Sequence, residues 1–84
     1  MSRIKILVVD DDKDILDFLT NFLQENEFEV YSQDNGEDVL SIIEENKIDL
    51  LIIDLKLAGM NGLDISKEVA LNHDIPIIMI SGVN

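Results

Sequence analysis

The sequence contains no cysteine, few basic residues and no long apolar run. Without cysteine the chain can form neither a disulfide framework nor a thiolate zinc site, which fits a reducing compartment, so we expect a cytoplasmic protein. No apolar stretch approaches the ~20 residues of a membrane-spanning helix. The apolar run near the N-terminus is short and is followed by three aspartates, so a signal peptide is not expected either.

Positive charge is also scarce, because 6 lysines and arginines stand against 18 acidic residues, giving a formal net charge of −12. This balance repels phosphates, and the sequence has no basic stripe, so binding of nucleic acid by this segment is not expected. Most of the acidic residues are expected to solvate the surface. With 84 residues, of which 46% are apolar, we expect one globular domain over residues 1–84.

Aliphatic runs and helical patterns alternate along the whole chain. Strands are expected at residues 4–9, 28–32, 48–55 and 75–80, and helices at residues 15–23, 39–43 and 63–70. Nearly continuous β-branched runs are typical of strands that are buried on both faces. Strands that alternate with helices indicate a parallel sheet with right-handed crossovers and helices on both faces. The predicted fold class is therefore α/β, a doubly wound parallel sheet in the order βαβαβαβ.

Carboxylates follow two of the predicted strands, and a hydroxyl follows another. Asp10 and Asp11 come after the first strand, Asp54 ends the third, and Ser81 follows the fourth. Ligands of open parallel sheets bind beyond the carboxyl ends of the strands, so these side chains are expected to share one rim. Two carboxylates ~5 Å apart repel by roughly 3 kcal/mol at an effective dielectric near 20, which favours a bound cation. Ligands that are all oxygen suit Mg²⁺, completed by water and phosphate oxygens.

Three segments resemble the receiver domains of two-component response regulators (the CheY-like family), in the correct order and spacing. "ILVVDDD" is similar to the first strand of that family with its acidic pair at Asp10 and Asp11. "DLLIIDLKLAGMNGLD" resembles the phosphorylation loop, with Asp54 as acceptor and Gly62 eight residues later. "IPIIMISG" resembles the fourth strand with its terminal hydroxyl at Ser81. The resemblance implies a flavodoxin-like fold.

The resemblance also implies a role for each matching residue. Asp54 would accept a phosphoryl group from a sensor histidine kinase or a phosphotransfer protein. Asp11 would bind Mg²⁺ directly, Asp10 largely through a metal-bound water, and the backbone carbonyl of Lys56 would supply a further ligand. Ser81 would donate a hydrogen bond to a phosphoryl oxygen. A receiver of this kind takes part in its own phosphorylation and is not a turnover enzyme.

The sequence departs from the family pattern at two places. Ala58 stands where the family usually has proline, four residues after the acceptor, which should loosen the loop. The family also continues with a helix, a strand that carries a phosphoryl-binding lysine, and a final helix, on the order of 35–40 residues by average element lengths. Without these elements residues 75–80 are expected to form an open apolar edge, so we expect self-association through that edge, including by exchange of elements.

Two other interpretations remain open at the level of sequence. Asp10 and Asp12 also resemble the nucleophile and acid/base pair of haloacid-dehalogenase-type phosphatases, although Asp14 stands where that family has threonine or valine. The same fold could instead serve as a docking or self-associating module that is not phosphorylated. A calcium loop that starts at Asp10 is excluded, because Ile15 occupies the required glycine position.

Overall fold

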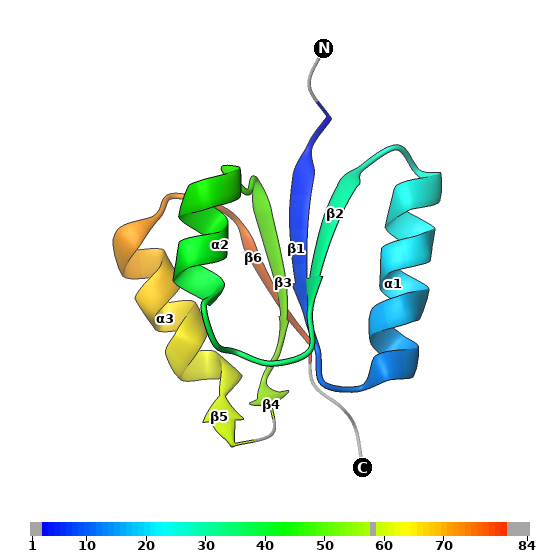
Figure 1. Cartoon of the computed structure of the whole chain (residues 1–84). Coiled ribbons are helices and arrows are strands. Elements are labelled where there is room, and N and C mark those ends of the chain that lie inside the picture. Colours follow the sequence, from blue (N-terminus) through cyan, green and yellow to red (C-terminus); the bar gives the residue numbers. More distant parts are fainter. Residues whose placement is uncertain (1–2, 58, 81–84) are drawn as a thin grey trace.

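The computed structural model describes residues 3–57 and 59–80 and shows a parallel sheet between helices (Figure 1). The strands of the sheet lie in the order β2-β1-β3-β6 and are all parallel, with bounds β1 Lys5–Val9, β2 Glu29–Gln33, β3 Leu50–Asp54 and β6 Ile77–Ile80. A short antiparallel hairpin of β4 (Lys56–Leu57) and β5 (Met60–Asn61) follows β3. The doubly wound α/β prediction is confirmed, and the hairpin lies where the sequence indicated only a loop.

Helices cover both faces of the sheet. Helix α1 (Lys13–Glu25) lies on one face, and α2 (Val39–Asn46) and α3 (Gly62–Asn72) lie together on the other (Figure 1). Alternate residues of β1 belong to different cores, because Leu7 and Val9 pack with residues of α2 and α3 whereas Ile6 and Val8 pack with residues of α1. This two-sided burial explains the continuous aliphatic run of β1. No helix in the described part of the chain is long and apolar enough to cross a membrane.

Helix α1 has more apolar residues along one side than the sheet covers. Leu16 is buried, and Leu19 and Leu23 pack against the same core. Phe18 and Phe22 follow the same helical apolar spacing in the sequence, yet these residues are 66% and 51% exposed. Their rings stack on each other, with centroids 6.1 Å apart. Helical periodicity identifies the apolar side of a helix, but the direction from which the sheet approaches decides which residues are covered.

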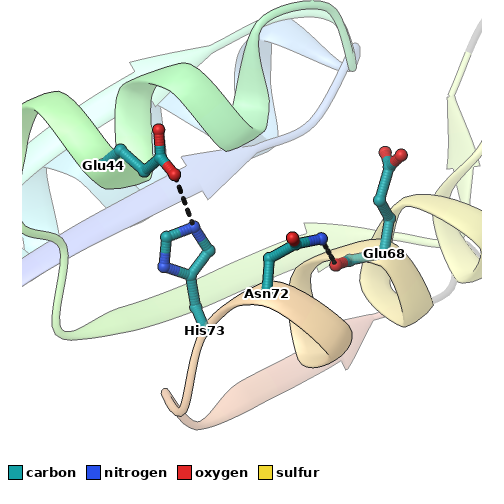
Figure 2. Close-up of polar contacts among 4 residues, drawn as sticks. All are labelled: Glu44, Glu68, Asn72 and His73. Atoms are coloured by element: carbon teal, nitrogen blue, oxygen red, sulfur yellow. Dashed lines mark hydrogen bonds and ion pairs between the residues drawn. The ribbon is translucent and has the colours of Figure 1, made fainter.

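Helices α2 and α3 contact each other near their C-terminal ends (Figure 2). The backbone N–H of His73 donates to the carbonyl of Val69 at 2.8 Å, which ends α3. The His73 side chain is 18% exposed, and its Nε2 lies 3.9 Å from Oε1 of Glu44 on α2. This pair places an imidazole between the two helices.

Strand β6 forms one edge of the sheet. It pairs only with β3 among the described strands, and all four of its residues are uncharged. Two of them, Ile78 and Met79, are each 48% exposed. The opposite edge, β2, carries Glu29 and Ser32 and is more polar. Unpaired, uncharged edges are the sites at which sheets pair with other chains.

Candidate functional site

The register of the sheet brings the predicted acidic residues to a common rim. Val9 pairs with Ile53 in the sheet, and Asp54 pairs with Ile80. Asp10 therefore leaves β1 beside the end of β3, where Asp54 lies. The carboxyl ends of adjacent parallel strands are where ligands of this fold class bind.

Three carboxylates meet at this rim. Asp10, Asp11 and Asp54 each offer an oxygen within 4.8 Å of the others. Asp10 is 1% exposed and Asp54 8% exposed, whereas Asp11 is exposed to solvent. The structure thus brings together the three acids that the sequence singled out. Ser81 and Ala58 lie outside the described residues.

Backbone N–H groups hold the two buried carboxylates in place. Asp10 Oδ1 accepts a hydrogen bond from the N–H of Asp12 at 2.8 Å, and Asp54 Oδ1 accepts one from the N–H of Lys56 at 3.1 Å. Lys56 therefore contacts the site through its amide, and the ligand role of its carbonyl stays a prediction. These two amide contacts were not foreseen, although both follow the common turn pattern in which aspartate accepts from the residue two positions later.

Asp12 serves the helix and not the cluster. Its Oδ1 accepts from the N–H groups of Asp14 and Ile15 at 3.0 and 3.4 Å, which caps α1. A side chain that caps a helix satisfies backbone donors that would otherwise lack a partner. The phosphatase interpretation required Asp12 as an acid/base group beside Asp10, and this arrangement argues against it.

The crowded carboxylates raise the cost of ionising Asp10. Burial of its carboxyl group is the largest cause and raises the pKa of Asp10 above its usual value, and the N–H of Asp12 acts in the opposite direction. The charges of Asp54, Asp11 and Asp12 raise that pKa further. At an effective dielectric of about 20, two unit charges 4.8 Å apart repel by roughly 3 kcal/mol. A divalent cation among the three oxygens would remove this repulsion.

The donor set fits Mg²⁺. All three converging side chains offer carboxylate oxygens, and hard divalent cations prefer oxygen over nitrogen or sulfur. Mg²⁺ also keeps several waters and commonly takes one or two carboxylates together with phosphate oxygens. An exposed Asp11 leaves the rim accessible to such ligands from solvent.

Gly62 packs directly against the backbone of Asp54 and Leu55. Its N–H donates to the carbonyl of Leu55 at 2.9 Å. A Cβ at this position would lie 2.0 Å from the carbonyl oxygen of Asp54 and 2.8 Å from Cα of Leu55. Only glycine therefore allows α3 to begin this close to the end of β3. The sequence marked Gly62 by its spacing from Asp54, but this contact could not be read from spacing alone.

Comparison with known proteins agrees with this fold. Residues 6–84 match the family model of the response regulator receiver domain. The heme response regulator HssR of Staphylococcus aureus is 35% identical over 78 residues, which cover 93% of this chain and 35% of that protein. The chain thus spans about a third of the length of the curated relatives that it matches.

Solved structures give the same result. TrrA of Thermotoga maritima, a response regulator solved in complex with Mg²⁺ and BeF, is 33% identical with a TM-score of 0.87, covering 95% of this chain and 70% of that one. The BeF₃-activated receiver domain of Klebsiella pneumoniae RstA has a TM-score of 0.88 at 22% identity, covering 95% and 68%, and supports the fold. This chain belongs to the response regulator receiver domain family. Receiver domains are signalling modules of two-component systems, and they bind Mg²⁺ at an acidic pocket.

Proposed function

We propose that this chain accepts a phosphoryl group onto Asp54 from a cytoplasmic sensor histidine kinase or phosphotransfer protein, with Mg²⁺ bound at the rim. The observation that carries the proposal is the convergence of Asp10, Asp11 and Asp54 within 4.8 Å. Asp54 is the member of this cluster that ends a strand and is held by the N–H of Lys56. We further propose that residues 1–84 act as one receiver unit.

The chemistry consists of positioning and charge neutralisation. A carboxylate oxygen of Asp54 attacks the phosphorus, the bond to the imidazole nitrogen of the donor breaks, and an acyl phosphate forms. Asp11, Asp54 and the carbonyl of Lys56 would hold Mg²⁺ directly, and Asp10 through a water. The cation supplies positive charge to the phosphoryl oxygens, as in phosphoryl transfer generally. Ser81 would donate a hydrogen bond to one of these oxygens.

Incubation with acetyl phosphate and Mg²⁺ tests the proposal directly, with intact mass as the readout. The wild-type chain is expected to gain one phosphoryl group, and Asp54→Ala is expected to gain none because it lacks the nucleophile. Asp64→Ala, which removes an exposed carboxylate in the first turn of α3, should behave as the wild type. Equal labelling of Asp54→Ala and the wild type would refute Asp54 as acceptor.

A titration with beryllium and fluoride together with Mg²⁺ distinguishes the proposed phosphoacceptor from the alternative, a docking module of the same fold that is not phosphorylated. A working acceptor binds this acyl-phosphate mimic at Asp54, so backbone amide resonances around Lys56 should shift. A chain that gains no phosphoryl group and binds no mimic would keep the receiver fold without its activity.

We also propose that the chain associates with a second copy through the β6 edge. Ile78 and Met79 are exposed along an uncharged strand that lacks a neighbour on one side among the described strands. Pairing of two such edges would satisfy backbone groups and cover these side chains. The net charge of −12 opposes association, so the dimer should strengthen as salt screens the repulsion.

Met79→Lys is expected to abolish this association, because it places a charge on the edge that must pair. Ser32→Lys on the opposite edge strand adds the same charge and should leave association intact. Sedimentation of the three proteins across concentration and ionic strength measures the effect. A wild type that stays a compact monomer at micromolar concentration under all conditions would contradict the proposal.

A further inference from the structure

A second concave site lies on the α2–α3 face, apart from the carboxylate rim. It is a groove of about 420 Å³, and it is lined by the loop before α2, the first turn of α2, β5 and α3. Asp10, Asp11 and Asp54 do not line it. A volume of this size accommodates one or two side chains of a bound partner.

The floor of the groove is apolar and closely packed. Val39 and Ile65 form its buried part, and Leu40 and the 39%-exposed Met60 line its open part. The backbone of Gly36 closes one end, since a Cβ there would lie 2.4 Å from Cδ1 of Ile65 and 3.0 Å from Sδ of Met60. The floor is therefore present before any partner binds.

The rim of the groove is acidic. Glu37 and Asp38 precede α2, Glu68 comes from α3, and all three are exposed, whereas none of the residues lining the groove is basic. Acidic residues near a helix N-terminus often serve only the helix dipole. That explanation does not cover Glu68, which lies in the interior of α3 and whose side chain takes no part in the His73–Glu44 contact (Figure 2). Asp38 makes no side-chain hydrogen bond to cap α2.

We propose that this groove docks a basic, partly apolar peptide segment of a partner protein, which inserts a lysine or arginine side chain. The charged head would meet the carboxylates at the rim while its aliphatic stem, together with a neighbouring apolar side chain of the segment, packs on Leu40 and Met60, since long basic side chains combine both properties. We infer a basic segment because its positive charge is complementary to the acidic rim of the groove. At this groove the acidic rim disfavours a second copy of the chain, with its 18 acidic and 6 basic residues, as well as a nucleic acid or an anionic membrane.

Fluorescence anisotropy with a labelled peptide that alternates lysine and leucine tests the proposal. Glu37→Gln and Glu68→Gln are each expected to weaken its binding roughly two- to five-fold, the worth of one exposed ion pair, and the groove double variant, which carries both substitutions, should weaken it further. The matched control is the double variant Glu25→Gln with Glu27→Gln, which removes the same charge at the end of α1 on the other face of the sheet. It should leave the affinity nearly unchanged.

A second peptide in which serine replaces leucine tests the apolar floor and should bind several-fold more weakly. Thermal unfolding of each variant verifies that the surface substitutions leave the fold intact. Equal weakening by the groove double variant and the control double variant would mean diffuse attraction to an acidic protein and would overturn the proposal. Equal affinity for the two peptides, or no binding of the lysine–leucine peptide, would overturn it as well.

Discussion

Asp10→Asn is expected to raise the free energy of unfolding of the metal-free chain by about 1–3 kcal/mol, because it removes one buried charge from a repelling set of three carboxylates. Asparagine keeps an oxygen that can accept from the N–H of Asp12, so the turn should survive. The same substitution should weaken stabilisation by Mg²⁺. Urea unfolding with and without Mg²⁺ measures both effects, since a ligand that binds only the folded state raises the free energy of unfolding by mass action.

The matched control is Asp17→Asn, which neutralises an exposed carboxylate in the middle of α1. Exposed substitutions of this kind usually change stability by less than about 0.5 kcal/mol. A metal-free Asp10→Asn variant less stable than the wild type would show that the Asp10 carboxylate stabilises the fold, contrary to the electrostatics of the rim.

The pH dependence of this difference follows from the direction of the pKa shift. Burial raises the pKa of Asp10 above its ordinary value of 3.8. Between the pKa of the unfolded chain and that of the folded chain, the folded chain therefore retains a proton that the unfolded chain has already released. The stability contribution of Asp10 is therefore present below pH 3.8 and is lost as pH rises through the folded pKa. Without metal, Asp10→Asn and the wild type should converge in stability in acid and separate toward neutral pH.

Gly62→Ala is expected to destabilise the fold by about 3 kcal/mol, the upper part of the usual range for overpacking. The added Cβ would meet the carbonyl oxygen of Asp54 at 2.0 Å and the carbonyl carbon of Asp54 at 2.9 Å. These are backbone atoms at the end of a buried strand, so they cannot turn aside as a side chain can. Displacing them should also slow labelling of Asp54 by acetyl phosphate.

Gly36→Ala is the informative comparison for this prediction. Its Cβ would meet Cδ1 of Ile65 at 2.4 Å and Sδ of Met60 at 3.0 Å, which are the ends of flexible side chains. We expect a smaller loss of about 1 kcal/mol, measured by the same urea titration, and near-normal labelling of Asp54. Equal losses for the two variants would mean that the backbone between β3 and α3 yields easily.

The sheet and the acidic rim could be predicted from the sequence because each depends on short-range patterns. The aliphatic runs locate β1 and β3, and parallel pairing then brings Asp10 and Asp54 to the same edge without further information. Asp12 at the start of α1 was likewise predictable, since aspartate before a helix commonly caps it.

Other features depend on tertiary contacts that no local pattern encodes. The exposure of Phe18 and Phe22 is set by the direction in which α1 crosses the sheet. Asp38 adopts a left-handed conformation with φ 62°, although its sequence resembles an ordinary helix start. The proximity of His73 to Glu44 arises only when α2 and α3 lie side by side.

The tripeptide from Asp10 to Asp12 joins the rim to α1 through consecutive hydrogen bonds. The amide of Asp12 fixes the Asp10 carboxylate, and the carboxylate of Asp12 fixes the amides of Asp14 and Ile15. Any reorientation of Asp10 must therefore rotate the peptide that anchors the first helical turn. The carboxylate rim and the first turn of α1 are therefore mechanically coupled. A change of conformation at the rim reaches α1 through this tripeptide and not through the hydrophobic core.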